Sequence, residues 1–543
     1  MKRSRNKNSN SKNDTLFFNK IRWFWVFFVA AIALWTISLG NVPLRDWDEG
    51  SHAIVARELY RTGNWLYLTF FGQPYFMKPP LGYWIVAGSY HLFGGVSELT
   101  TRLPVAIISS LGIPLLYLVG REVFPRRLSA ILSASVYLTL LPVVRHGRLM
   151  MLDGIINTFF ILLLLCLLKA RKRRSWALGI GLCLACIALT KGILVFALGA
   201  IAGLFVLCDR DWSIFKNPYA WLGLLLGITL TFSWYYTQWL EYGDRFIQIH
   251  LGSQNFDRLA TAVEGNDGPP WYYLIELLKY SFPWLLFWPG GLVLAWFGQI
   301  RSNSPSSPSN FANSLFKKRE SWANLVLSGT ILFLGTISLM GTKLPWYVMP
   351  LYPFVSLAVG ANLTQLWQSR KSYSRFFVAF FGLLSVVGLG GCIYFIIADP
   401  QPVLIVMGLV VAATMGVVAW KMRGNNPQFI PILAIGMYCT LALLMLSTSW
   451  NWELNEQFSV VRAGELIREN TPPGVIYISF DYNRPSLDFY SDRIVNPADV
   501  PALRQHWEAG GYLLLDAEAM EALQIPENAI VGTTDGWTLV RPL

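Results

Sequence analysis

Residues 23–52 read WFWVFFVAAIALWTISLGNVPLRDWDEGSH, an apolar run that passes directly into an acidic one. The apolar part, Trp23–Leu39, approaches the roughly 20 residues that a helix needs to cross a bilayer. Residues 1–22 before it are polar and basic, as in a signal sequence, but no small-x-small cleavage site precedes the polar residues 45–49. We therefore expect an uncleaved signal anchor whose N-terminus stays in the cytoplasm.

Similar apolar runs recur along the chain. Of its 543 residues, 54% are hydrophobic and only 14% are charged, whereas soluble domains carry roughly 25% charged residues. This composition excludes a water-soluble enzyme, a coiled coil and a disordered scaffold, and it predicts an α-helical polytopic membrane protein. The runs predict thirteen transmembrane helices, at residues 23–40, 103–120, 128–145, 154–169, 176–190, 193–208, 219–239, 282–299, 322–340, 346–366, 376–397, 402–420 and 429–448.

The net charge of +12 is unevenly distributed. Lysines and arginines cluster between the apolar runs, where positive charge marks the cytoplasmic side, and no basic stripe interleaved with aromatics indicates nucleic-acid binding. Residues 450–543 instead contain 14 acidic residues, 6 arginines and no lysine. An odd number of spans places this segment outside the cytoplasm. Ser302–Ser314, rich in serine, proline and asparagine, is predicted to be a flexible inner loop.

The chain is therefore predicted to have three parts. A cytoplasmic basic tail covers residues 1–22, and a transmembrane bundle covers residues 23–449 with outer loops at 41–101 and 241–280. An extracytoplasmic domain covers residues 450–543. We expect the protein in the plasma (inner) membrane, with its N-terminus cytoplasmic and this last domain periplasmic or extracellular.

Both outer loops are too long to be simple turns. In the first, Glu49–Arg61 and Pro80–Phe93 are too short to span the membrane, so we expect two helices along its outer surface. In the C-terminal segment the hydrophobic period changes and predicts a small α/β domain. Its predicted elements are helices Val460–Glu469 and Val500–Trp507 with Asp499 as N-cap, strands Val475–Phe480 and Tyr512–Leu515, and a hairpin over Ile530–Val540 that turns at Asp535–Gly536.

The chemistry is most concentrated in residues 46–52, DWDEGSH, which hold three carboxylates and a histidine within seven residues. Such groups are costly to hold near hydrocarbon, which favours a functional role. On a helix that begins near Trp47, Asp48 and His52 lie one turn apart on the same face, where they can share a proton or flank one substrate. The structural alternative is equally weighted, because Asp46 with Glu49 three residues later imitates a capping box.

Cations gather on the same predicted outer side, which the positive-inside rule depletes. Each of them alone is compatible with a side chain that reaches to the membrane interface. Together with the carboxylates they favour an anionic ligand, for which a phosphate at the membrane surface is the natural candidate. They are Lys78, Arg145, Arg148, Lys191, Arg258 and Lys343.

These motifs resemble the membrane glycosyltransferases of the GT-C class. The resemblance covers nearly the whole chain and is strongest to the lipid A aminoarabinose transferase branch, which is related to the protein O-mannosyltransferases (dolichyl-phosphate-mannose protein mannosyltransferases). It rests on Trp47-Asp48-Glu49, Ala56-Arg57-Glu58, Gly63-Asn64-Trp65, Pro74-Tyr75-Phe76, Lys78-Pro79-Pro80, Tyr83-Trp84, Arg102-Leu103-Pro104, Thr190-Lys191-Gly192, Pro269–Tyr273, Pro283-Trp284 and Lys343-Leu344-Pro345.

The resemblance implies roles for several residues. Asp48 would be the catalytic carboxylate beside Glu49, and Lys78 would contact the donor phosphate. Glu49 and Asp153, the acidic position of the second outer loop, are further catalytic candidates. The donor would be a polyprenyl-phosphate-linked hexose or pentose, transferred with inversion to a lipid, glycan or protein acceptor. His52, Tyr75 and Tyr273 are further site candidates because they lie in or beside the same motifs.

Two departures from the family bear on cofactors and on the acceptor. Many relatives have glutamate where this chain has Met77, and histidine where it has Asn266-Asp267. No cofactor is therefore assigned, and a divalent metal stays open with Asp48 and Glu49 as its ligands. The alternatives to a transferase are a polyprenyl-lipid transporter or flippase and a non-catalytic lipid-binding membrane protein. The oligomeric state is left unassigned.

Overall fold

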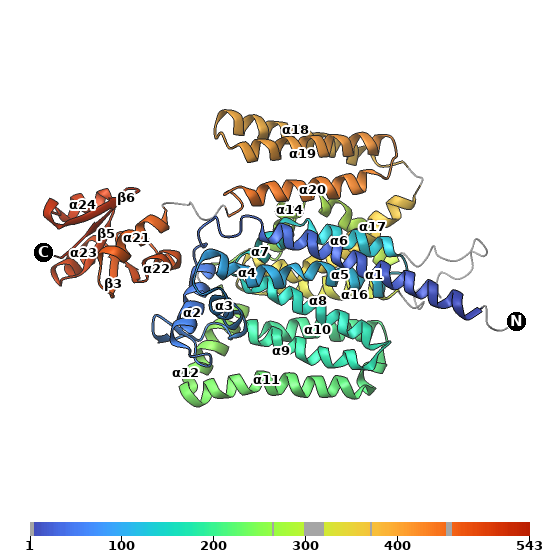
Figure 1. Ribbon diagram of the computed structural model, residues 1–543, viewed down its shortest axis with the longest axis horizontal. Coiled ribbons are helices and arrows are strands. Elements are labelled where there is room, and N and C mark those ends of the chain that lie inside the picture. Colours follow the sequence, from blue (N-terminus) through green and yellow to red (C-terminus); the bar gives the residue numbers. More distant parts are fainter. Residues whose placement is uncertain (1–4, 263–264, 298–319, 370–371, 452–458, 543) are drawn as a thin grey trace.

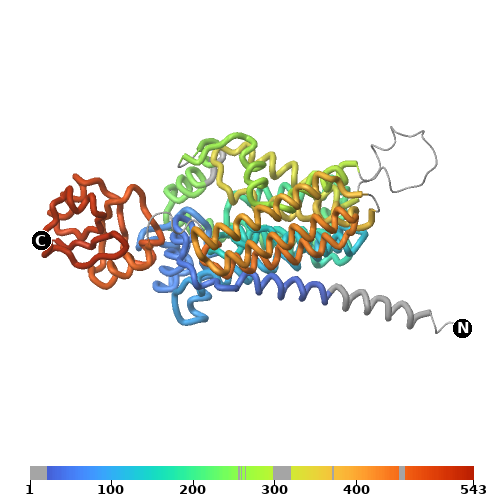
Figure 2. The backbone as a smooth tube through the Cα atoms, turned by 90° about the horizontal axis from the view of Figure 1, so that it is seen from above, coloured from blue at the N-terminus to red at the C-terminus, as the bar shows by residue number. Residues whose placement is uncertain are grey.

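The computed structural model describes residues 5–262, 265–297, 320–369, 372–451 and 459–542. The loop predicted at Ser302–Ser314 lies outside these residues. Figure 1 shows long helices side by side, with the C-terminal domain beyond one end of the bundle and the start of α1 at the other end. Figure 2 shows the same separation from a second direction.

Apolar helices make up the bundle and confirm the predicted polytopic class. Among the described residues, seven helices are long and apolar enough to cross a membrane, or eight if a pair bent by 58° is one span. Three shorter apolar helices add to these, and the number thirteen stays a prediction. The bundle contains α1 (Arg5–Thr36), α4 (Glu98–Ser110), α5 (Gly112–Val123), α6 (Arg127–Leu138), α7 (Leu141–Arg148), α8 (Leu152–Ala170), α9 (Leu178–Lys191), α10 (Leu194–Cys208), α11 (Pro218–Tyr242), α15 (Trp288–Phe297), α16 (Ser321–Leu339), α17 (Tyr352–Gln368), α18 (Arg375–Ile397), α19 (Pro402–Arg423) and α20 (Phe429–Leu446).

The bent pair is α6 and α7, which the sequence predicts as one span over residues 128–145. Pro142 lies in the first turn of α7, where its missing N–H costs nothing. The bend brings Arg145, His146 and Arg148 into the protein, and all three are buried. These three residues therefore do not lie at the end of one straight span, although the sequence predicts that they do.

The two helices predicted in the first outer loop lie at the end of the bundle nearest the C-terminal domain (Figure 1). These are α2 (Asp48–Thr62) and α3 (Leu81–Phe93), and a short hairpin of β1 (Thr69–Phe70) and β2 (Gln73–Pro74) lies between them in the sequence. Gly63 ends α2 with φ of 67°, a left-handed conformation that glycine adopts without strain. The second outer loop contains α12 (Asp244–Ile247), the π-helix η3 (Gln248–Phe256), α13 (Asp257–Ala260) and α14 (Tyr272–Tyr280).

The C-terminal domain is a five-stranded sheet in the order β4-β3-β5-β7-β6, with helices packed on it. The strands are β3 (Val475–Ile478), β4 (Ile494–Pro497), β5 (Tyr512–Leu515), β6 (Ile530–Thr534) and β7 (Trp537–Val540), and the helices are α21 (Val460–Asn470), α22 (Pro485–Ser491), α23 (Val500–Glu508) and α24 (Ala517–Leu523). The predicted helices, strands and hairpin are present, and the Asp499 side chain accepts from Ala502 N–H as predicted. Three further elements, β4, α22 and α24, were not predicted from the sequence.

Basic loops collect at the end of the bundle away from α2. Arg171 forms ion pairs of 2.8 Å with Asp209 and Asp211, and Lys172 contacts Glu122, so three loops that the sequence places in the cytoplasm meet. α8 and α9 begin or end near these loops, and their other ends carry Asp153 and Lys191. One end of this helix pair therefore lies among the basic loops. The other end carries one carboxylate, Asp153, and one lysine, Lys191.

Candidate functional site

A polar cavity of about 540 Å³ lies at the end of the bundle beneath α2. Its lining includes seven of the twelve predicted site residues, which come from α2, the loop before α3, α8, α9 and α13. These are Asp48, His52, Tyr75, Lys78, Asp153, Lys191 and Arg258. The structure therefore brings together residues that are spread over more than 200 positions.

An apolar cavity of about 560 Å³ adjoins the polar one. Its walls come mainly from α10 and α16, with Leu194, Phe196 and Phe333 among the lining side chains. Six residues line both cavities and so mark the junction between them. They are Lys78, Asp153, Lys191, Gln254, Arg258 and Tyr347.

Asp48 is the first residue of α2 and is half-buried in the polar cavity. Burial raises the pKa of its carboxyl, but the neighbouring His52, Lys78 and Lys191 outweigh burial and hold the pKa below its ordinary value. Burial also lowers the pKa of His52 to about 4, so its imidazole is neutral near pH 7. The two lysines thus keep Asp48 ionised at neutral pH, as a proton acceptor requires.

His52 is held by a chain of two tyrosines. Its Nδ1 lies 2.9 Å from the Tyr83 hydroxyl, which donates to the Tyr75 hydroxyl at 3.1 Å. Burial raises the pKa of both tyrosines well above the usual value, so both stay protonated. The chain fixes the orientation of the imidazole that lies one helical turn from Asp48.

Lys78 is placed by the two prolines that follow it. Proline restricts the preceding residue to extended backbone, so Lys78 cannot join α3, which begins at Leu81. Its half-buried ammonium lies at the cavity junction and has no ion pair among the described residues. Burial and the charge of Lys191 lower the pKa of Lys78 to about 8. A nearby anion would stabilise the charged ammonium and offset the free-energy cost of burying it.

Lys191 is already neutralised by a carboxylate. Its Nζ lies 2.9 Å from Asp153 Oδ1 and 5.2 Å from the centre of the Tyr347 ring. Gly192 follows Lys191 and ends α9 with φ of 47°, a conformation that glycine adopts without strain. The backbone therefore leaves the helix directly after the lysine. Asp153 and Lys191 thus form one wall of the site as an ion pair.

Glu49 is adjacent to Asp48 but does not line either cavity. Its carboxylate accepts from Arg102 Nε at 2.8 Å and Nη2 at 2.7 Å, and both side chains are fully buried. It also accepts from Met150 N–H at 2.8 Å and Arg45 N–H at 2.6 Å. Four hydrogen bonds occupy this carboxylate, which favours a structural role for Glu49, and its catalytic role stays a prediction.

Glu49→Gln is therefore expected to destabilise the protein by about 3–5 kcal/mol, because it leaves the buried Arg102 without a counter-charge. Thermal unfolding in detergent measures this loss. Glu241→Gln, at an exposed glutamate of α11, is the matched control and should leave the unfolding temperature unchanged. An inactive Glu49→Gln enzyme of normal stability would instead restore Glu49 to the chemistry.

Asp46 and Glu49 do not form the capping box that was the structural alternative for residues 46–49. The N-cap of α2 is Trp47, which makes no side-chain capping bond. Asp46 instead forms an ion pair with Arg484 of the C-terminal domain, at 2.6 Å from Nη2. Asp46 thus meets the C-terminal domain and Glu49 meets Arg102, whereas Asp48 lines the polar cavity.

Besides Glu49, four predicted residues do not line the polar cavity. Arg148 donates to the Leu34 and Ile37 carbonyls at 2.7 and 2.6 Å, at the end of α1. Lys343 donates to the Ser338 and Met340 carbonyls at 2.7 and 2.6 Å, at the end of α16. Both satisfy helix C-termini, which carry partial negative charge. The Tyr273 hydroxyl accepts from Leu344 N–H at 3.3 Å.

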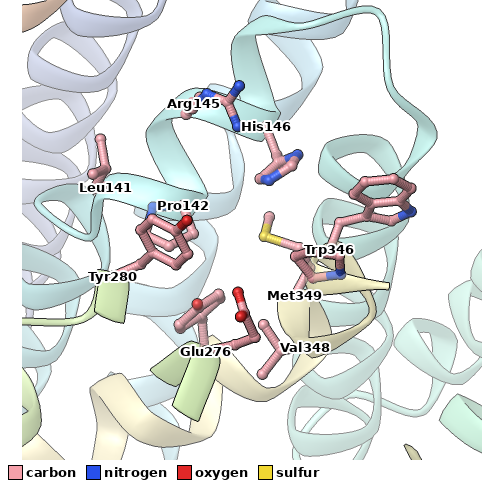
Figure 3. Close-up of a pocket in the computed structure, with 11 residues that line it drawn as sticks. Leu141, Pro142, Arg145, His146, Glu276, Tyr280, Trp346, Val348 and Met349 are labelled. Atoms are coloured by element: carbon pink, nitrogen blue, oxygen red, sulfur yellow. The ribbon is translucent and has the colours of Figure 1, made fainter. Parts of the chain in front are cut away.

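Arg145 is the fourth, and it lines a separate small cavity (Figure 3). His146, Glu276 and Trp346 line the same cavity, and Arg145 Nε donates to the Trp450 carbonyl at 3.1 Å. Trp346 also lines the polar cavity and so separates the two. The six predicted cations are therefore split, with only three of them at the cavity junction.

The lining does not fit a metal ion. Among the described residues, no three His, Cys, Asp or Glu side chains come together to hold one. Glu49, the predicted partner of Asp48 as ligand, is fully engaged by Arg102. Met77 and Asn266, the positions at which the sequence was noted above to depart from the family pattern, both line the polar cavity.

Some lining residues were not singled out by the sequence analysis. Gln254 and Tyr347 lie at the junction, and Arg45, Ser51 and Trp47 line the polar cavity. Tyr347 lies two residues after the Lys343-Leu344-Pro345 motif, from which only the conspicuous cation Lys343 was selected. Gln254 lies in an uncharged stretch of the second outer loop and gives no sequence signal.

The chain is similar in sequence to several known proteins. A family described as dolichyl-phosphate-mannose-protein mannosyltransferase matches residues 77–236. The undecaprenyl phosphate-alpha-4-amino-4-deoxy-L-arabinose arabinosyl transferase 1 of Pseudomonas fluorescens is 26% identical over 476 residues, which cover 82% of this chain and 80% of that protein. Its counterpart from Shewanella sediminis is 31% identical over 273 residues, 48% of each chain.

Solved structures share the fold. The crystal structure of ArnT from Cupriavidus metallidurans bound to undecaprenyl phosphate superposes with a TM-score of 0.75 at 19% identity, covering 96% of this chain and 98% of that one. The archaeal oligosaccharyltransferase AglB from Archaeoglobus fulgidus superposes with a TM-score of 0.53 at 11% identity, covering 96% of this chain and 74% of that one. The predicted GT-C architecture is confirmed.

Proposed function

We propose that this chain, a GT-C membrane glycosyltransferase that takes its sugar from a polyprenyl phosphate, uses Asp48 as its general base and Lys78 with Arg258 as its donor phosphate site. The observation that carries the assignment is the junction of an apolar cavity with a second cavity that contains most of the ionisable site candidates. An apolar cavity of about 560 Å³ meets a polar one of about 540 Å³ at Lys78, Lys191 and Arg258. A polyprenyl phosphate sugar has the same sequence of parts, with a hydrocarbon tail, an anion and a polar ring.

The donor would lie across the junction. Its tail would occupy the apolar cavity between α10 and α16, and its phosphate would meet Lys78, Arg258 and the Tyr347 hydroxyl. The sugar would then lie in the polar cavity beside Asp48 and His52. Lys191 is paired with Asp153 and would act mainly by positioning that wall.

The reaction follows from this placement. The acceptor hydroxyl attacks the anomeric carbon while the bond from that carbon to the phosphate oxygen breaks. Asp48 accepts the hydroxyl proton, and the bonding electron pair leaves with the lipid phosphate, whose growing charge the cations stabilise in a site with little water. Attack on the face opposite the leaving phosphate inverts the anomeric carbon.

The rival functions account for less of the geometry. A transporter or flippase needs a polar path at mid-membrane, whereas the ionisable groups described here gather at one end of the bundle. A non-catalytic lipid-binding protein needs the cations but has no use for an ionised carboxylate beside them. The relatives named above act on an undecaprenyl phosphate sugar, and we carry over the donor class, with a lipid, glycan or protein as acceptor.

Comparison of cells with and without the gene tests this function. Mass spectrometry of their membrane lipids and glycans should find a polyprenyl phosphate sugar that accumulates in the deletion strain and a glycosylated product that disappears. Complementation with the wild-type gene should reverse both changes. Unchanged levels of every polyprenyl phosphate sugar would contradict the proposal.

We place the protein in the inner membrane with its N-terminus in the cytoplasm and residues 459–542 outside. The gathering of Arg171, Lys172 and their partner loops at one end supports this orientation, because positive loops stay cytoplasmic. A reporter fused after Leu543 should therefore be active only outside the cytoplasm. Activity of that fusion inside the cytoplasm would reverse the assignment.

A further inference from the structure

The C-terminal domain packs directly on the helix that carries Asp48. The contact is made by α22, the helix that the sequence analysis missed, and its first residues lie against the start of α2. A β-carbon on Gly50 would lie 2.7 Å from the Ser486 nitrogen and 2.8 Å from the Pro485 carbonyl carbon. The two backbones can approach this closely only because residue 50 has no side chain.

Both residues that precede Asp48 are held by this domain. Asp46 accepts from Arg484 Nη2 at 2.6 Å and Nε at 2.8 Å, and from the Ser486 hydroxyl and backbone N–H. Asp46 and Arg484 are 9% and 5% exposed, so water screens this ion pair little. The Tyr482 ring stacks on Trp47 with centroids 5.6 Å apart and planes 20° apart.

The backbone between these contacts is not one that the sequence would adopt by itself. Trp47 has φ of 62° and ψ of −112°, a conformation that residues with a β-carbon rarely take. Such a conformation persists where the surroundings determine it. Here the Tyr482 ring stacks on Trp47 itself and Arg484 holds the preceding Asp46, and both residues belong to the C-terminal domain.

We propose that the C-terminal domain positions the catalytic base, with Arg484 and Tyr482 as positioning residues that act through Asp46 and Trp47 on Asp48. The inference rests on the proposed role of Asp48. A general base must lie within hydrogen-bond reach of the proton it accepts, and a small displacement lowers the rate of proton transfer. The phosphate site comes from the bundle and its outer loops, so donor binding does not depend on this contact.

Arg484→Gln and Tyr482→Ala, made in the full-length protein, test the proposal. We expect kcat to fall about ten- to hundredfold for Arg484→Gln and several-fold for Tyr482→Ala, while affinity for the probe undecaprenyl phosphate stays within about twofold. Tyr482→Phe keeps the ring and should retain wild-type kcat. Arg462→Gln removes an exposed arginine that pairs with Asp535 in the same domain, and it should change neither quantity.

A pair of glycines provides an independent test. Gly50→Ala should force α22 away from α2 and lower kcat, with undecaprenyl phosphate binding retained. Gly88→Ala is the matched control, because a β-carbon at that α3 residue meets no atom within 4 Å. It should keep wild-type kcat.

The results for these variants test the positioning role separately from the proposed glycosyltransferase function. If Asp48→Asn is inactive while Arg484→Gln and Tyr482→Ala turn over at the wild-type rate, the positioning role is wrong and the transferase assignment stands. If Asp48→Asn itself is fully active, the proposed base is wrong. If Arg484→Gln does not fold, the comparison of kcat between Tyr482→Ala and Tyr482→Phe tests the positioning role instead. Parallel loss of stability, probe binding and turnover in Tyr482→Ala would make the contact purely structural and overturn the proposal.

Discussion

Asp48→Asn is expected to lower turnover by about 10²- to 10⁴-fold, because the amide keeps the size and hydrogen bonding of the carboxylate but cannot accept the hydroxyl proton. The residue lies in the polar cavity beside the junction where the donor phosphate would bind. Binding of undecaprenyl phosphate should therefore survive. Single-turnover rates and equilibrium binding on the same purified sample separate the two effects.

Asp244→Asn is the matched control for this substitution. Asp244 is exposed in α12 of the second outer loop and lines neither cavity, so its loss should leave kcat unchanged. Wild-type turnover of Asp48→Asn would remove Asp48 from the chemistry. Asp153 is then the remaining carboxylate of the polar cavity that a substrate could reach.

Lys78→Met is expected to abolish activity and to weaken binding of undecaprenyl phosphate, because it removes a cation from the junction of the two cavities. Lys78→Arg should recover only part of both, since a planar guanidinium does not replace a compact ammonium in a confined site. Turnover and probe binding are the measurements. Lys279→Met, at an exposed lysine paired with Glu276, is the matched control.

The same lysine sets an expected pH dependence. Burial and Lys191 lower the pKa of Lys78 to about 8 in the free protein, so its charge is present below that pH and lost above it. The ratio kcat/KM should therefore decline as the pH rises through 8. Lys78→Arg should lack this decline, because guanidinium stays protonated throughout that range. An unchanged alkaline decline in Lys78→Arg would assign it to another group.

Much of the architecture could be predicted from local features of the sequence. Apolar runs about as long as a bilayer is thick predict membrane helices whatever their neighbours are. The Asp535–Gly536 turn occurs where predicted, because its two residues take the positive φ values, 48° and 85°, that this kind of hairpin needs. The position of Lys78 outside helix α3 could be predicted because the two prolines after it act within a few residues.

The roles within the Asp46–Glu49 motif were decided by the tertiary structure alone. Successive residues of a helix point about 100° apart, so Asp48 reaches the polar cavity while Glu49 meets Arg102. No pattern in the motif reveals which residue meets which partner. Asp46 likewise depends on Arg484, a residue 438 positions away.

The same limit applies to the six cations. The sequence places all six on one side of the membrane from the positions of the spans, but it does not reveal their individual partners. Lys78, Lys191 and Arg258 reach the junction, whereas Arg148 and Lys343 satisfy carbonyls at helix ends. A charge of one sign attracts a ligand and a helix terminus alike, so chemistry alone does not choose between them. Only the packing of the helices brings one or the other within reach of each side chain.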